Sequence, residues 1–340
     1  MFKLNKTAAC VAAALMAVGA GSAQAARIDP FGLGGAGGVY EVANLGWNNG
    51  NALSTPITSV SGATSDPTVG DTVQTYGQAK LQGLNDSDGN SFVIAGFNPN
   101  AWTYVFGFSE VVTTVDTAAN SSVFQTTTVA GQANFFQIWA NGTGASDLTG
   151  KGFNGDGGAV LLLSGKVSDF DPTTGIGQTS FDSSAVTAGN LDQFGGNSYA
   201  GYSSVAGTGG GKINVEIDSV NDKYFLDGLS LLTLDFITDT FQNLPFLQVN
   251  PSSCFWDGSA YFSGAGNGIP DGCGVAGDGG TIGFLNGFDT RALPGGDPAY
   301  TNTIFQTRAT SVLPTEIPEP GTLALLGLGA LGMFVRRRKS

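Results

Sequence analysis

Apolar and polar residues alternate along much of this chain with the period of β-strands. Residues 212–218 read Lys-Ile-Asn-Val-Glu-Ile-Asp, so every second side chain is apolar, as in a strand with one buried face. Residues 102–115 form a nearly continuous run of aromatic and β-branched residues, which also favour strands. Further strands are predicted at residues 72–84, 122–130, 133–140, 159–167, 229–237 and 303–312.

Polar segments rich in Gly, Asn, Asp and Ser separate these runs and predict turns, for example at residues 85–90 and 207–211. Residues 122–130 and 133–140 flank Gly131-Gln132 and are predicted to pair as a hairpin. The sequence contains no amphipathic helix longer than about three turns and no internal repeat. It therefore predicts one large all-β body, a β-sandwich or jelly roll with Gly-rich loops.

The first 25 residues predict a cleavable signal peptide. Lys3 and Lys6 provide the positive start, and a short apolar run extends from Thr7 to Ala20. Ala23 and Ala25 form the small-residue pattern of a cleavage site. We therefore expect export through the Sec machinery and removal of residues 1–25 by signal peptidase.

The C-terminal segment, residues 318–340, predicts a second address. Pro318-Glu319-Pro320 precedes an uncharged apolar run of 14 residues, Thr322 to Val335, and Arg336-Arg337-Arg338-Lys339 follows it. As a helix these 14 residues span about 21 Å. The run is therefore shorter than the ~20 apolar residues that a full bilayer crossing needs. The four cations would stay in the cytoplasm, leaving the body, residues 26–317, outside with a transient membrane anchor.

This order of Pro-Glu-Pro, short apolar helix and Arg cluster resembles the C-terminal sorting tail of PEP-CTERM proteins. The resemblance implies that an exosortase in the inner membrane recognises the tail and cleaves near Pro318, Glu319 and Pro320. The protein would then pass to the cell surface or the extracellular matrix. Hosts of this family are typically Gram-negative bacteria that make exopolysaccharide.

Composition excludes several kinds of chemistry. The chain has no His, which excludes a Ser-His-Asp triad, a Cys-His pair and any His-ligated metal. Without the signal peptide and the tail, the chain has 8 Lys and Arg and 26 Asp and Glu, which gives a formal net charge of −18. So acidic a body repels phosphates, and we expect no nucleic-acid partner.

The body also resembles that of the flocculation-associated PEP-CTERM proteins. The similar stretches, in chain order, are residues 28–31, 76–81, 134–138, 191–197 and 248–251. The resemblance implies an exported protein that cells need in order to aggregate into flocs within an exopolysaccharide matrix. It implies no catalytic or ligand-binding residues.

Cys254 and Cys273 are the two cysteines that remain after signal cleavage. Two cysteines in an exported protein are expected to form a disulfide. Two free buried thiols are the alternative. The enclosed segment contains Trp256 and Tyr261, the best candidates for stacking on sugar rings, although aromatic residues more often pack in a core.

Asp86, Asp88 and Asn90 have the spacing that begins a calcium loop. Ser91 and Phe97 stand where an EF-hand needs Gly and a bidentate Glu, so an EF-hand is excluded. A calcium site of another type and a plain Asx-rich turn both fit the sequence.

These observations predict an exported, non-enzymatic surface or matrix protein that acts with exopolysaccharide in flocculation or biofilm formation. Two alternatives are left. One is a glycosidase that cleaves the polymer with a pair of carboxylates, which needs no His. The other is a structural coat protein without a ligand. No motif selects a catalytic pair from Glu41, Glu110, Glu216 and Glu316.

Overall fold

Antiparallel strands make up most of the described chain. The structure, a computed structural model, describes residues 25–48, 50–58, 68–119, 121–140, 144–145, 152–155, 158–182, 206–229, 231–236, 244–245, 254–263 and 303–313. The strands are β1 Ala26–Ile28, β2 Tyr40–Val42, β3 Asn44–Trp47, β4 Gly50–Thr58, β5 Thr72–Asn85, β6 Thr103–Asp116, β7 Ser121–Thr127, β8 Phe135–Ala140, β9 Val160–Val167, β10 Gln178–Asp182, β11 Ala206–Val220, β12 Leu231–Phe236, β13 Leu244–Pro245, β14 Cys254–Trp256, β15 Tyr261–Ser263, β16 Thr303–Thr307 and β17 Ala309–Val312.

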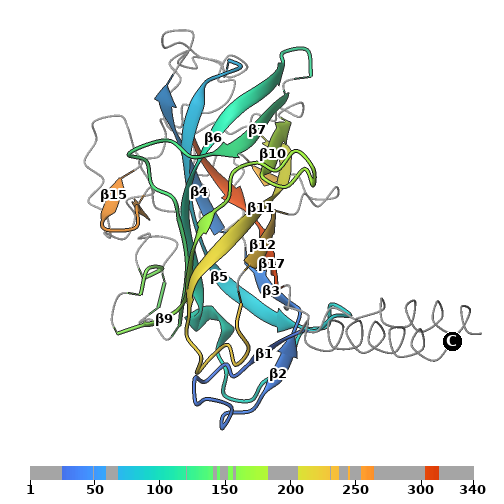
Figure 1. Cartoon of the computed structure of the whole chain (residues 1–340), viewed down its shortest axis with the longest axis vertical. Coiled ribbons are helices and arrows are strands. Elements are labelled where there is room, and N and C mark those ends of the chain that lie inside the picture. The colour runs from blue at the N-terminus through green and yellow to red at the C-terminus, as the bar shows by residue number, and fades with distance from the viewer. Residues whose placement is uncertain are drawn as a thin grey trace, which may run out of the picture.

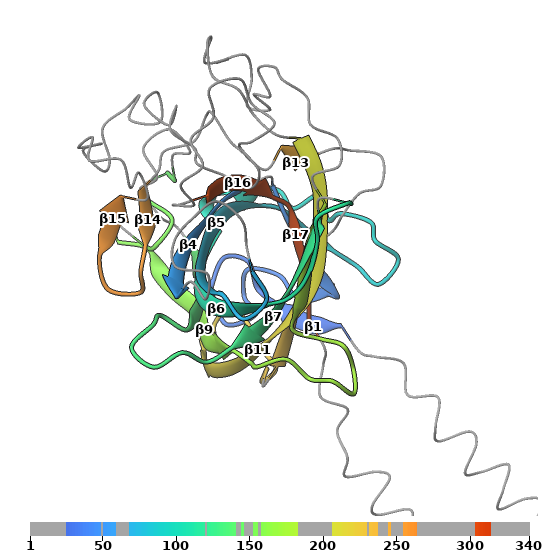
Figure 2. The same cartoon turned by 90° about the horizontal axis from the view of Figure 1, so that it is seen from above.

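Eight of these strands close into a ring. The order around it is β5, β6, β8, β9, β11, β12, β17 and β3, each strand antiparallel to the next, and β3 pairs again with β5. Figure 2 shows this ring from above. At one end of the barrel β4, β7 and β10 take the places of β3, β8 and β9 beside β5, β6 and β11. The long strands therefore run the length of one barrel (Figure 1).

The all-β prediction is confirmed, but the predicted β-sandwich or jelly roll is not, because one sheet closes on itself. Closure follows from strand length. β5 and β6 have 14 residues each and β11 has 15, and along one side each pairs with two successive partners. Long tilted strands of this kind curl a sheet until its edges meet.

Two local predictions were wrong. β7 and β8 do not pair with each other as a hairpin. Both pair with the same edge of β6, β8 at Thr103–Gly107 and β7 at Ser109–Asp116. Residues 207–211 are not a turn but part of β11, where a Cβ on Gly211 would lie 2.3 Å from the carbonyl oxygen of Gln178. The glycines there allow β10 and β11 to approach closely.

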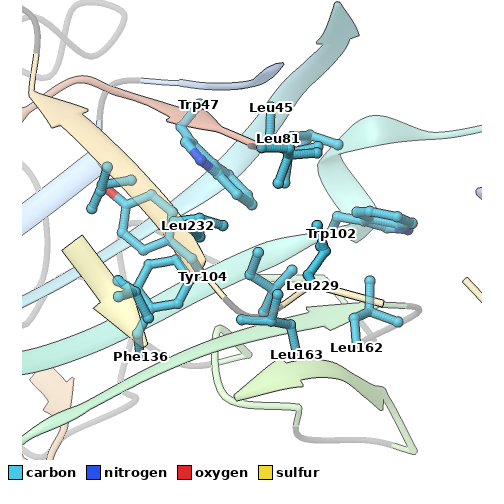
Figure 3. Close-up of a cluster of buried hydrophobic side chains, with 14 of the residues drawn as sticks. Leu45, Trp47, Leu81, Trp102, Tyr104, Phe136, Leu162, Leu163, Leu229 and Leu232 are labelled. Atoms are coloured by element: carbon cyan, nitrogen blue, oxygen red, sulfur yellow. The ribbon is translucent and has the colours of Figure 1, made fainter. Parts of the chain in front are cut away.

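The barrel interior is filled with large apolar side chains. Alternate residues of each strand point inward, as the period of two requires, and the largest of them come together in one cluster (Figure 3). Trp47 meets Tyr104 edge to face with ring centroids 4.8 Å apart, and Tyr104 stacks on Phe136 at 6.0 Å. Burial of these rings is the main stabilising contribution in this part of the fold.

The outer face of β6 is buried as well. Thr103, Val105 and Ser109 are at most 4% exposed although they point away from the inner cluster. The Thr103 hydroxyl donates to the carbonyl of Phe153, in an outer loop, at 2.8 Å. The β14–β15 hairpin is drawn outside the ring in Figure 2. Its Gly258 lies against Phe135 of β8, because a Cβ on Gly258 would be 3.1 Å from the Phe135 ring. Burial on both faces explains why residues 102–115 read as an apolar run without alternation.

Within the described residues, the single helical segment is the 3₁₀ turn Pro99–Ala101, and no helix there is long and apolar enough to span a membrane. The predicted signal peptide and C-terminal helix lie outside the described residues.

The core predicts a stabilising substitution. The Tyr104 hydroxyl is buried and has no hydrogen-bond partner among the described residues, a state that costs about 1–3 kcal/mol. Tyr104→Phe keeps the ring and removes the hydroxyl, so it should raise the free energy of unfolding in urea by about 1 kcal/mol.

Tyr104→Leu is the matched control. It also removes the hydroxyl but leaves a cavity beside Trp47 and Phe136, and should lower stability by about 1–3 kcal/mol. A Tyr104→Phe chain less stable than the parent would show that the hydroxyl makes a favourable hydrogen bond.

Candidate functional site

Both ends of the predicted body leave the barrel at the same place. Ala26, at the start of β1, pairs with Val42 in β2. Leu313 follows β17, and its N–H donates to the carbonyl of Ala43 at 3.0 Å. The Ala43 N–H in turn donates to Asn85, the last residue of β5, at 2.9 Å. The segment that leads to the predicted sorting tail therefore begins beside the predicted mature N-terminus.

A buried hydrogen bond fixes the last strand before the tail. The Trp47 indole N–H donates to the Ser311 hydroxyl at 2.7 Å, and both residues are 0% exposed. Ser311 lies in β17 opposite Leu45 of β3. This bond joins residues 264 positions apart, so it ties the C-terminal strand to the start of the body inside the core.

Three loops cover this end of the barrel: residues 29–39, 86–101 and 221–229. Aromatic rings of these loops, together with Trp102 directly after the second loop, pack in a row. Phe31 meets Phe97 with ring centroids 6.3 Å apart, Phe97 meets Trp102 at 5.7 Å, and Trp102 meets Tyr224 at 5.9 Å. We call this end, comprising residues 26–42, 86–101, 221–229 and 312–313, the capped end. The other end, with the β6–β7 turn at residues 117–119, is the far end.

A single carboxylate organises the loop between β1 and β2. Asp29 is 0% exposed and accepts four backbone N–H bonds, from Phe31 at 3.0 Å, Leu33 at 3.2 Å, Gly35 at 2.8 Å and Gly37 at 3.1 Å. Burial raises the pKa of Asp29, but the four bonds outweigh burial and the pKa lies below its usual value of 3.8. The carboxylate therefore remains ionised and holds the loop in one conformation.

Sequence reasoning did not identify this role of Asp29. The available signal was an Asp-Pro pair directly before a Gly-rich segment, because glycines leave backbone N–H groups free to turn toward one acceptor.

The predicted calcium residues form a compact turn. Asp86 Oδ1 accepts the N–H groups of Asp88 at 2.9 Å and Asn90 at 2.8 Å. The Asn90 amide donates to Asp86 Oδ2 at 3.2 Å, and Gly89 has a φ of 82°. These bonds lower the pKa of Asp86, the N–H of Asn90 contributing most. The geometry is that of an Asx-rich turn, and calcium binding stays a prediction.

The sugar-stacking candidates and one of the two cysteines lie in the β14–β15 hairpin. Trp256 is half-buried in β14, where it pairs with Tyr261 of β15. The Asp257 carboxylate accepts the N–H groups of Ser259 and Ala260, each at 2.7 Å, and so fixes the turn. Cys254 begins β14, but Cys273 lies outside the described residues. The disulfide and the sugar contact both stay predictions.

Glu110 places a carboxyl group inside the barrel. Glu110 has the same strand alternation as Tyr104 and Phe106, so it faces inward, and it is 3% exposed. It accepts hydrogen bonds from the hydroxyls of Thr75 at 2.8 Å and Thr179 at 2.5 Å. Burial raises the pKa of Glu110 and outweighs the two hydrogen bonds, which lower it.

The sorting residues are beyond the described part of the chain. Ala25, the residue directly before the body, is described. Ala23, Pro318, Glu319, Pro320 and the basic residues Arg336, Arg337, Arg338 and Lys339 are not. What the structure describes is the place where the tail leaves, at Leu313 on the capped end.

Comparison with protein families identifies this tail. Residues 316–339 match the PEP-CTERM protein-sorting motif. The motif implies processing by an exosortase, export and transient membrane anchoring before display at the cell surface. No curated protein and no solved structure matches the chain.

Asp29 gives a prediction for the stability of the capped end. Asp29→Asn replaces an acceptor of four N–H groups by an amide whose NH₂ cannot accept, so the free energy of unfolding at pH 7 should fall by about 2–3 kcal/mol. Because the folded pKa is lowered, the contribution of Asp29 is present above the usual value of 3.8 and disappears as the pH falls below it. The deficit should therefore shrink on acidification.

Asp222→Asn at an exposed position of the same end is the control and should leave stability unchanged within about 0.5 kcal/mol. Urea unfolding at several pH values measures both variants. Equal stability of Asp29→Asn and the parent at pH 7 would contradict the organising role of this carboxylate.

Glu110 predicts the opposite pH dependence. Its folded pKa is raised above the usual 4.5, so its protonated form stabilises the fold at low pH and the contribution is lost as the pH rises. Glu110→Gln should therefore gain stability relative to the parent as the pH rises above 4.5, by about 1.4 kcal/mol for each unit by which the pKa is raised. The exposed Glu41→Gln is the control, and a parallel pH profile for parent and Glu110→Gln would refute the prediction.

Proposed function

We propose that this chain is an exported, non-enzymatic surface or matrix protein that supports flocculation or biofilm formation with exopolysaccharide. In this proposal the barrel is the exported cargo, and the tail delivers it to the cell surface through an exosortase. The observation that carries the proposal is the sorting motif at residues 316–339, which begins three residues after Leu313.

The flocculation role draws on the resemblance of the body. Residues 28–31 lie at the end of β1 and in the Asp29 loop, 76–81 in β5, and 134–138 at the start of β8. The side chain of Asn134 bonds both backbone groups of Val167, at 2.9 and 2.8 Å. The similar stretches thus include positions that build the barrel and its cap, so the resemblance favours a shared fold. Residues 191–197 and 248–251 lie outside the described residues.

The surface chemistry supports a partner rich in neutral hydroxyl groups. The chain is only 12% charged and its body is acidic. A surface of this kind hydrates largely through Ser, Thr, Asn and Gln side chains, which can exchange hydrogen bonds with a polysaccharide. An acidic body could bind an anionic polymer only through bridging cations such as calcium.

Glu110 is the observation that favours an alternative, a glycosidase acting on the same polymer. A buried carboxyl with a raised pKa suits a general acid. The alternative requires a second carboxylate on the opposite side of the sugar, whereas the hydrogen-bond partners of Glu110 are two threonines. Hydrolysis of the host polymer that is abolished by Glu110→Gln would favour it.

The sorting motif provides the test of the proposed function. A strain lacking the gene receives either the intact chain or a chain with Pro318, Glu319 and Pro320 replaced by Ala. The triple variant should accumulate uncut in the inner membrane, because the exosortase no longer recognises it, and the cells should settle as poorly as the deletion strain. Membrane fractionation, the size of the protein and floc settling measure the result.

Pro314→Ala is the matched control, because Pro314 precedes the matched motif and its variant should be processed and flocculate normally. Release of the triple variant in its processed form would contradict sorting through this tail. Normal processing of the intact chain with unchanged settling in the deletion strain would contradict the flocculation role alone.

A further inference from the structure

The capped end carries four of the five large apolar side chains that are exposed among the described residues. The five are Leu33 at 62% exposed, Val39 at 41%, Val69 at 55%, Val93 at 100% and Val312 at 38%. Four of them, all except Val69, belong to the capped end. Val69 lies just before β5 begins, at the far end.

The tail leaves from this same end. Eight residues separate Leu313 from the apolar run that begins at Thr322, and an extended chain of this length spans at most about 30 Å. The 14 residues of β5 extend about 48 Å along the strand, or about 35 Å along the axis of a barrel with ordinary strand tilt. A tail inserted in a bilayer therefore holds the capped end close to the lipid headgroups.

We propose that the capped end lies against the membrane surface while the tail anchors the protein, with Leu33, Val39, Val93 and Val312 in the interfacial region of the lipid. The far end then points away from the membrane. The tether limits the distance from the bilayer, and the apolar side chains set the orientation. The inference rests on the proposed sorting function, because it requires the tail to insert.

Burial of apolar side chains, not charge, attracts the capped end to the lipid. The loops and strands of the capped end carry two basic residues against five acidic ones besides the buried Asp29: Arg27 and Lys223 against Glu41, Asp86, Asp88, Asp222 and Asp227. Anionic lipid would repel such a surface. Transfer of exposed Leu and Val side chains from water to lipid is favourable whatever the headgroup charge. Zwitterionic lipid is therefore the appropriate partner.

The test measures how close each end of the full-length mature chain comes to lipid. An environment-sensitive fluorophore is attached at Val93→Cys on the capped end or at Ala118→Cys, exposed in the β6–β7 turn of the far end. Both proteins, with their tails, are bound to phosphatidylcholine vesicles that carry a nitroxide on the headgroup. The unmutated chain treated with the same dye gives the background from Cys254 and Cys273.

Quenching at position 93 should be at least about threefold stronger than at position 118, since nitroxide quenching is confined to short range. Addition of anionic lipid should reduce the difference. Equal quenching at the two positions, or stronger quenching at position 118, in protein that floats with the vesicles would overturn the orientation and leave tail insertion intact. Failure of the protein to float with the vesicles would overturn both tail insertion and this inference. A chain that ends at Ile317 lacks the tail and is the control for protein that is not anchored.

Discussion

Closure of the barrel by β17 is the constraint on which the rest of the structure depends. This short strand, Ala309–Val312, pairs with β12 on one side and with β3 on the other. The buried bond from Trp47 to Ser311 fixes it to the core. Without β17 the sheet would have two open edges, which invite pairing with other chains. The barrel therefore closes only when the last residues before the sorting tail are in place.

The capped end follows from this closure. Leu313 reaches Ala43 because β17 lies beside β3, and Ala43 in turn bonds Asn85 at the end of β5. The loops that follow β1, β5 and β11 then meet over the end of the barrel, and Asp29 holds the first of them through four N–H bonds. The contacts that close the barrel thus also set the point from which the sorting tail leaves.

The sequence predicted the positions of the main strands well and their partners poorly. The predicted runs at residues 72–84, 102–115 and 159–167 match β5, β6 and β9 within two residues. β7 and β8 were assigned to each other because they are neighbours in the chain, but β6 is long enough to pair with both. Asp29 escaped detection because its four partners are backbone groups, which leave no side-chain motif.

The sequence by itself determined the β-strand content, the acidic body without His and the sorting motif, because periodicity, composition and short motifs are local properties. The tertiary structure decided that the sheet closes, that Glu110 faces the interior, and that both ends of the body meet at one end of the barrel. Those features depend on which strands pair across up to 268 positions of chain, from Asn44 to Val312. Such pairing is set by the fit of complete strands around a shared core, and no segment of sequence contains that information alone.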